Sequence, residues 1–338
     1  MRDLVQQARW LIRDIAFLPL TLPGAAWACR RFGRKNAILS FHNVLECKFD
    51  NKKLIHNVDL DVTTFKSQLH FLKANYKVLP ISKINDWPNV EGIFLSFDDG
   101  LLNNYTTVLP ILEEFGVTAM FAVCPDLVNQ KIPYLWRDWL YLGLSNLGDF
   151  QEIRKFESTK CTGPSLTDSN LNSESLFRKI CPDLYSSKNP YEKLAEWFPH
   201  PHKIVKNNEF IEKRFRPMSW AQIEELRYKG HVIASHLMTH RPPRYMAESQ
   251  LIRELIDSKN EISKNINQAC NYLVFPYGNK RLVNARAIEI AKNQYRILFM
   301  NESDNIYQNT LPRFSLPHTS SRVRLLASIA GYLERLKK

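Results

Sequence analysis

Two adjacent carboxylates, Asp98 and Asp99, close a short apolar stretch and are followed by Gly100. Residues 93–97 are rich in strand-forming side chains, so they predict a buried strand that ends at the two acids. Neighbouring side chains on an extended backbone point to opposite sides, which would let one carboxylate hold a metal while the other acts as a base. Two acids of a turn would give the same pattern, because Asp-Gly pairs favour turns.

A pair of histidines, His236 and His240, follows a second strand-like segment at residues 231–235. Imidazoles at positions i and i+4 can face the same way on a helical turn. Together with one aspartate they would bind a divalent cation and leave one coordination position open, which is typical of catalytic sites. Two surface histidines of a helix have the same spacing, so the prediction depends on the strand before them and on the aspartate pair in the same chain.

These motifs together resemble those of the polysaccharide deacetylase family, the NodB-type enzymes of carbohydrate esterase family 4. The resemblance rests on Ser-Phe-Asp-Asp-Gly at residues 96–100 and Ser-His-Leu-Met-Thr-His at residues 235–240, supported by residues 218–230 and by Phe-Pro-Tyr-Gly at residues 275–278. It implies an α/β fold, a distorted (β/α)7-type barrel.

The resemblance, together with the charge pattern of the two ends, divides the chain into three parts. A basic N-terminal extension is expected at residues 1–36, the barrel at residues 37–321 and a basic amphipathic helix at residues 322–338. At about residues 125–215 the strand and helix rhythm is lost, and we interpret this segment as an insertion over the barrel mouth.

The resemblance also implies a reaction, the removal of an N-acetyl group from an amino sugar. Asp99, His236 and His240 match the family's metal ligands, and Asp98 matches the base that takes a proton from metal-bound water before this water attacks the amide carbonyl. The metal and the backbone N–H of Tyr277 would stabilise the oxyanion. Zn²⁺ is the expected cofactor, and Co²⁺ or Ni²⁺ also suits two histidines and an aspartate.

The match to the family is less complete for the acid and for the residue that orients the base. His318 in Leu-Pro-His resembles the family's Leu-x-His motif and is the candidate acid, although a surface histidine beyond the last strand would fit the same position. Val274 stands where the family has the arginine that orients the base, and Arg313 is the predicted replacement. The family's Asp/Trp segment that shapes the acid is not recognisable near residues 301–306.

Three residues are predicted to contact the substrate. Besides Tyr277, these are Trp136, which would stack on a sugar ring or else belong to a local core, and His42, at the end of a predicted strand. The carboxyl ends of barrel strands carry the functional face, so His42 would line the site or pack behind it.

The predicted elements alternate between strands and helices, as a parallel barrel requires. Strands are expected at residues 37–42, 76–79, 93–97, 118–123, 231–235, 272–275 and 296–300. Helices are expected at residues 63–72, 105–115, 220–228, 248–268 and 285–293.

The net charge of +12 is concentrated at the two ends of the chain. Residues 1–36 hold seven Lys/Arg against two Asp, and residues 322–338 hold five against one Glu. This distribution argues against a nucleic-acid groove and favours an anionic membrane surface or an anionic partner. The apolar run at residues 15–29 contains prolines and is too short to span a bilayer, so it predicts a membrane-surface anchor or a helix packed on the barrel.

No cleavable signal peptide is recognised, and the six cysteines are scattered without a Cys-x-x-Cys pair, which is typical of a reducing compartment. We therefore expect a cytoplasmic protein, peripheral on the inner face of the membrane, in cell-surface glycan biosynthesis. The leading hypothesis is a metal-dependent N-deacetylase for a lipid-linked or nucleotide-linked amino-sugar precursor. The alternatives are a deformylase or deacylase of another small amide and a glycan-binding protein with a decayed site.

Overall fold

The computed structural model describes residues 36–46, 59–167, 169, 171–204, 209–301 and 310–329 of the 338-residue chain. The predicted N-terminal extension, apart from its last residue, and the end of the predicted C-terminal helix lie outside these ranges. The membrane-anchor interpretation of residues 15–29 therefore concerns residues that the structure does not describe.

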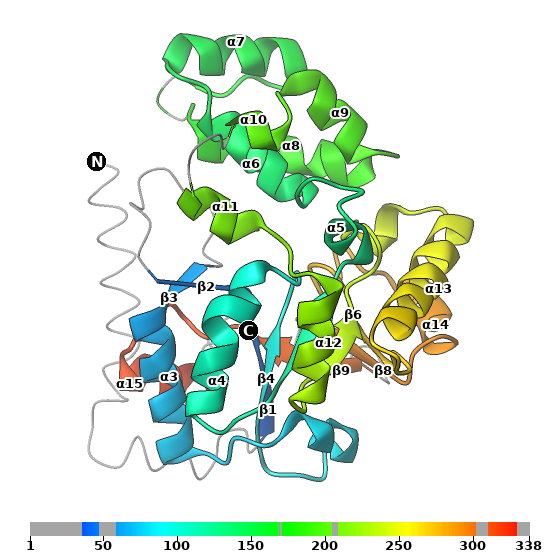
Figure 1. Cartoon of the computed structure of the whole chain (residues 1–338). Helices are drawn as coiled ribbons and strands as arrows, with labels where there is room; N and C mark the ends of the chain where they lie inside the picture. The colour runs from blue at the N-terminus through cyan, green and yellow to red at the C-terminus, as the bar shows by residue number, and fades with distance from the viewer. Residues whose placement is uncertain are drawn as a thin grey trace.

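Seven parallel strands close into a barrel in the order β1-β4-β5-β6-β7-β8-β9, which confirms the predicted fold class (Figure 1). The strands are β1 (Asn36–Phe41), β4 (Gly92–Phe97), β5 (Ala119–Val123), β6 (Val232–Ser235), β7 (Tyr272–Val274), β8 (Ile297–Met300) and β9 (Thr310–Phe314). A separate two-stranded sheet pairs β2 (Asn43–Leu45) with β3 (Asp59–Asp61). The barrel strands are almost continuously apolar because both of their faces are buried.

The register between the first two barrel strands sets the position of the site. β1 and β4 pair from Asn36 opposite Gly92 to Phe41 opposite Phe97, so both strands end at the same level. The N–H of Asp98 continues the ladder by donating to the carbonyl of Phe41 at 3.0 Å. The polar residues that directly follow the two strands, His42 and Asp98, therefore lie at the same level at the carboxyl end of the barrel.

Helices surround the barrel much as predicted. They are α3 (Val62–Asn75), the π-helical turn η3 (Asn104–Val108) with α4 (Leu109–Glu114), α12 (Trp220–Tyr228), α13 (Glu248–Asn265), α14 (Ala285–Lys292) and the short 3-10 turn η5 (Pro243–Tyr245). The predicted strand at residues 76–79 is wrong, because Val78 forms only an isolated bridge to Ile93 and a 3-10 helix, η2 (Ile81–Asp86), follows. Pro80 has no N–H with which to continue a ladder.

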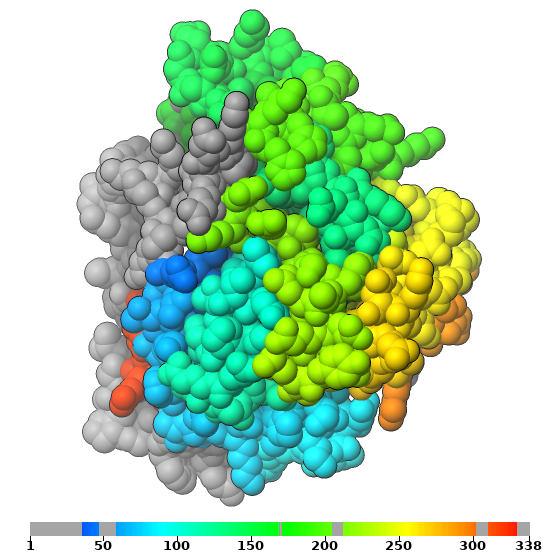
Figure 2. All heavy atoms as spheres, in the orientation of Figure 1, coloured from blue at the N-terminus to red at the C-terminus, as the bar shows by residue number. Residues whose placement is uncertain are grey.

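The insertion is a set of short helices with an apolar core of its own. It contains α5 (Pro125–Val128), α6 (Trp136–Ser145), α7 (Phe150–Lys160), α8 (Ser173–Ser186), α9 (Pro190–Trp197), α10 (Pro201–Ile204) and α11 (Glu209–Phe215). Figure 2 shows most of these helices as a lobe that stands on the barrel. α5 directly follows β5, so the lobe is at the carboxyl end of the strands (Figure 1).

The described part of the C-terminal helix, α15 (Arg322–Ile329), packs on the barrel. Its apolar residues Leu325, Leu326 and Ile329 are buried in the main core, so they are not available to a membrane surface. Within the described ranges, no helix combines the length and the apolar character that crossing a bilayer requires.

Candidate active site

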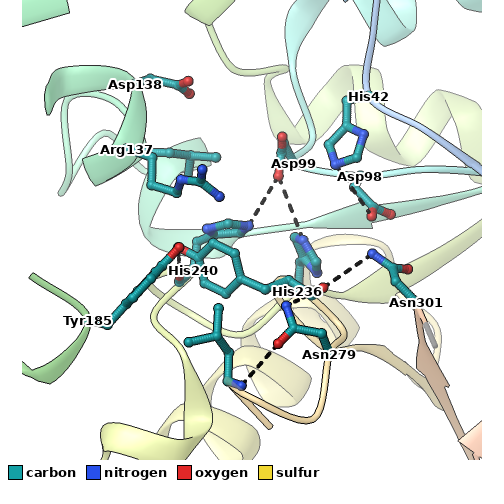
Figure 3. Close-up of a pocket in the computed structure, with 13 residues that line it drawn as sticks. His42, Asp98, Asp99, Arg137, Asp138, Tyr185, His236, His240, Asn279 and Asn301 are labelled. Carbon is teal, nitrogen blue, oxygen red and sulfur yellow. Dashed lines mark hydrogen bonds and ion pairs between the residues drawn. The ribbon is translucent and has the colours of Figure 1, made fainter. Parts of the chain in front are cut away.

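A cavity of about 260 Å³ lies where the carboxyl ends of the barrel strands meet the insertion. Its walls include residues that follow β1, β4, β6, β7 and β8, together with residues of the insertion (Figure 3). The lining residues are His42, Asp98, Asp99, Leu135, Arg137, Asp138, Tyr185, His236, His240, Tyr277, Asn279, Leu282 and Asn301.

The three predicted metal ligands converge in this cavity. The Oδ1 atom of Asp99 lies 3.4 Å from Nε2 of His240 and 3.7 Å from Nε2 of His236, and the three ligand atoms lie within 4.8 Å of one another. Nδ1 of His236 is 2.7 Å from the carbonyl of Val274, and this hydrogen bond leaves Nε2 facing Asp99. All three side chains are buried.

The residues present fit a divalent cation. The Oδ1 atom of Asp99 is buried and has no hydrogen-bond partner among the residues that the structure describes. Burial, and then the charge of Asp98, raise the pKa of Asp99 well above its usual value, so a cation is what would stabilise its charged form. Burial lowers the pKa of His236 to about 4, which keeps the imidazole neutral, the form that binds metals.

The two histidines do not lie on a helical turn, and that part of the sequence interpretation was wrong. Residues 236–240 form a loop in which His240 has a φ of 54°. The loop is held by the buried carboxylate of Glu254 on α13, which accepts hydrogen bonds from the N–H groups of Met238 and Thr239 at 2.9 and 3.1 Å and from the Thr239 hydroxyl at 2.6 Å. Glu254 was missed because it lies inside an ordinary amphipathic helix.

Asp98, the predicted base, is held by Arg313. The guanidinium donates two hydrogen bonds, from Nη1 to Oδ1 at 2.7 Å and from Nη2 to Oδ2 at 2.8 Å, and further ones to Ser96 at 2.6 Å and Asn301 at 2.9 Å. Burial alone would raise the pKa of Asp98, but the charge and hydrogen bonds of Arg313 outweigh it and hold the pKa far below its usual value. Arg313 thus takes the position that the sequence suggested for it.

The turn after β7 presents Tyr277 to the pocket. Tyr277 and Gly278 both have positive φ, 65° and 57°, and the carbonyl of Gly278 accepts a 2.7 Å hydrogen bond from the N–H of Asn301. The N–H of Tyr277 makes no hydrogen bond within the described part of the chain, as a donor to an oxyanion requires. The Tyr277 hydroxyl donates to the carbonyl of His240 at 3.2 Å.

The two remaining histidines differ in position. His42 lines the pocket with its Nε2 3.9 Å from Oδ2 of Asp98. His318 is not among the lining residues. Burial lowers the pKa of its imidazole, and the nearby residues Asp59 and Asp61 of β3 oppose this shift.

The stacking role predicted for Trp136 does not agree with the structure. The side chain has no exposed surface, and its ring packs edge-on against Tyr185 at 5.4 Å within the core of the insertion. It belongs to the local core that the sequence left open as the alternative.

Residues of the insertion that the sequence analysis did not assign do line the pocket: Arg137, Asp138 and Tyr185. The signal was present, since residues 134–141 combine aromatic and charged side chains.

A closed parallel barrel with an Asp-His-His cluster and a second, ion-paired carboxylate at its carboxyl end is the arrangement expected of a metal-dependent hydrolase. The profile of the family described as "Polysaccharide deacetylase" matches residues 178–295, which include both predicted histidine ligands. This match covers about a third of the chain, so the chain resembles this family over that segment.

Solved structures share the fold. The deacetylase PplD of Streptococcus pyogenes, in complex with acetate, is 16% identical with a TM-score of 0.55, over 88% of this chain and 99% of that one. IcaB from Ammonifex degensii is 14% identical with a TM-score of 0.52, over 88% and 97%. A de-N-acetylase from Aggregatibacter actinomycetemcomitans is 17% identical with a TM-score of 0.50, over 82% and 94%. No curated protein sequence matches the chain.

Proposed function

We propose that the protein is a metal-dependent N-deacetylase that hydrolyses the acetamido group of an amino sugar in a glycan or glycan precursor. The observation that carries the proposal is the buried cluster of Asp99, His236 and His240 with the ion-paired carboxylate of Asp98 beside it. The family profile and the barrel shared with solved deacetylases support it.

Asp99, His236 and His240 would hold the cation, and two nitrogen ligands with one carboxylate suit Zn²⁺, with Co²⁺ or Ni²⁺ as further options. When bound, a divalent cation supplies Lewis acidity, which polarises a carbonyl and makes water easier to deprotonate.

Asp98 is the base in this proposal. Its depressed pKa keeps the carboxylate ionised, so Asp98 can accept the proton that the attacking water must lose while its oxygens also accept hydrogen bonds from Arg313. Arg313 and Asn301 fix the carboxylate, so it needs no reorganisation when the proton arrives. The N–H of Tyr277 would donate to the oxygen of the amide as negative charge develops on it.

The amine leaves only if it gains a proton. His318 is the donor predicted from the sequence, but it does not line the pocket, whereas His42 does, so the geometry favours His42 as the donor. Burial lowers the pKa of His42, and the nearby charge of Asp98 opposes this shift by favouring the protonated form. The role of His318 stays a prediction from the motif.

The substrate we propose is a lipid-linked or nucleotide-linked precursor of a cell-surface glycan, processed in the cytoplasm at the inner face of the membrane. This follows from the basic ends of the chain and its scattered cysteines.

The direct test is acetate release from an N-acetylated amino sugar by metal-loaded protein, with and without a chelator. Asp98→Asn should keep its metal and lose turnover, while Asp86→Asn, a change at an exposed carboxylate on η2, should alter neither. Activity that survives complete metal removal would overturn the proposal. Turnover of only an N-formylated analogue would favour the deformylase, and absence of stoichiometric metal would favour a decayed glycan-binding protein.

A further inference from the structure

Arg137 is a charged side chain of the active-site pocket to which the proposed reaction gives no task. It is the second residue of α6 and reaches the pocket from the insertion rather than from the barrel. Figure 3 shows its side chain between Asp138 and His240, on the opposite side of the pocket from Asn301. Its positive charge therefore lies next to the place where the substrate's acetamido group must bind.

The contacts of Arg137 hold the guanidinium in place without neutralising it. Its Cζ lies 5.2 Å from the ring centre of Phe177 and 5.5 Å from that of Tyr277, within the range of cation–π contacts. A further hydrogen bond joins it to the thiol of Cys181. Burial raises the pKa of that thiol to about 11, so the sulfur is uncharged at neutral pH.

Among the described residues, no carboxylate forms an ion pair with Arg137, and its buried Nε has no hydrogen-bond partner there. Burial raises the pKa of the neighbouring acid Asp138, and the charge of Arg214 opposes this shift more than that of Arg137 does. Arg214 is fully buried and also pairs with Asp59 at 2.6 Å. The aromatic and thiol contacts therefore leave the partly buried guanidinium without a directly bonded anion at the wall of an open pocket, where a ligand can supply one.

We propose that Arg137 binds an anionic substituent, a phosphate or a carboxylate, on the same amino sugar whose acetamido group is hydrolysed. The proposal rests on the deacetylase function and adds the chemical class of its substrate. A planar guanidinium fork matches the two oxygens of either group. The cavity of about 260 Å³ is smaller than the range of roughly 300–1,000 Å³ common for ligand sites. The anion must therefore be attached to the reacting sugar or directly next to it.

The test compares three substrates of metal-loaded protein. They are the neutral methyl glycoside of N-acetylglucosamine, N-acetylglucosamine 1-phosphate and the corresponding N-acetylated sugar with a carboxylate at carbon 6. We expect kcat/KM to be about ten- to hundredfold higher for one of the anionic substrates than for the neutral one, mainly through KM, as a charge-assisted hydrogen-bond pair would give. The two anionic arms distinguish phosphate from carboxylate recognition.

Variants assign the preference to Arg137. In Arg137→Gln the ratio of anionic to neutral kcat/KM should fall at least about tenfold, and Arg137→Lys should retain part of it, because it keeps the charge and loses the fork. Arg286→Gln, at an exposed arginine of α14 that pairs with Glu248, is the matched control and should keep the wild-type ratio. Metal content is measured for each variant.

Two results would overturn the inference: a wild-type protein without preference for either anionic substrate, or a preference that Arg137→Gln leaves unchanged. The wild-type ratio needs no variant, so it decides the matter even if Arg137→Gln does not fold. Failure of the deacetylase proposal looks different, because no acetate would be released from any of the three substrates.

Discussion

Arg313 and Asp98 lie 215 positions apart in the sequence and are joined by two parallel hydrogen bonds of 2.7 and 2.8 Å at the carboxyl end of the barrel. Both side chains are almost fully buried, so the pair is shielded from solvent. The arginine therefore decides the charge of the carboxylate that we assign as the base.

Arg313→Gln should leave a buried Asp98 without its counter-charge, so burial would raise the pKa of this carboxyl. We expect the acid limb of the kcat/KM profile to move to higher pH and kcat/KM at neutral pH to fall by about 10²–10⁴, the contribution of a general base. Arg313→Lys keeps the charge and should show a smaller shift. An unchanged acid limb in Arg313→Gln would mean that Asp98 is not the group that this limb reports.

The donor of the leaving-group proton can be identified with a substrate that does not need it. His42→Gln should lower N-deacetylation by about 10²–10⁴, because general acid catalysis is lost. It should largely retain hydrolysis of 4-nitrophenyl acetate, whose phenolate leaves without protonation. His318→Gln should have little effect on either reaction, since the side chain does not line the pocket. The opposite pattern, with His318→Gln losing only amide hydrolysis, would restore the assignment made from the motif.

Alanine variants of two glycines with nearly the same backbone conformation distinguish the effect of backbone strain from the effect of a steric clash. Gly278 has a φ of +57° and Gly116 a φ of +61°, so alanine at either position costs about 1–2 kcal/mol of backbone strain. A Cβ at Gly278 would also lie 2.5 Å from the backbone nitrogen of Asn301, whereas one at Gly116 meets nothing within 4 Å. Asn301 holds Arg313, so its displacement would disturb Asp98.

Gly278→Ala should therefore lower kcat/KM at least about tenfold, as small displacements of catalytic groups do. Gly116→Ala should lower the melting temperature by a few degrees and leave the activity of the folded protein intact. Equal activity in the two variants would show that the turn after β7 does not position the base.

The barrel and the Asp-His-His cluster were predictable because each depends on local pattern. Residues 93–97 and 118–123 are apolar runs that become β4 and β5, and polar ligands after strands meet at the carboxyl end of any parallel barrel. The strand at residues 76–79 failed for a local reason too, since Pro80 stops the ladder after a single bridge.

The rest of the site depends on tertiary contacts that no local pattern encodes. Glu254 is one of several polar residues on α13, and only the tertiary fold brings its carboxylate next to the loop of residues 236–240. Arg137 and Trp136 are neighbours in the same aromatic segment, yet the arginine lines the pocket while the tryptophan is buried. Which face of α6 meets the barrel is decided by the packing of the insertion, and the sequence of α6 alone does not state it.

His231 offers a test of stability that is independent of the active site. Its Nδ1 accepts the N–H of Ala119 at 3.1 Å, and its ring packs edge-on against Phe121 at 5.3 Å. Burial lowers the pKa of His231 to about 4. The unfolded chain takes up a proton below its ordinary pKa of about 6.5, while the folded protein does so only near pH 4. The contribution of His231 to the free energy of unfolding is thus fully present above pH 6.5 and is lost as the pH falls towards 4.

His231→Asn should keep an acceptor for Ala119 and remove the titration. In urea unfolding of metal-free protein, lowering the pH from 7 to 4.5 should reduce the free energy of unfolding of the wild type by about 2–3 kcal/mol more than that of the variant. The active-site histidines titrate in both proteins, so their contribution cancels in the difference. Parallel pH dependences for the two proteins would show that His231 is protonated in the folded state, against the burial that the structure gives it.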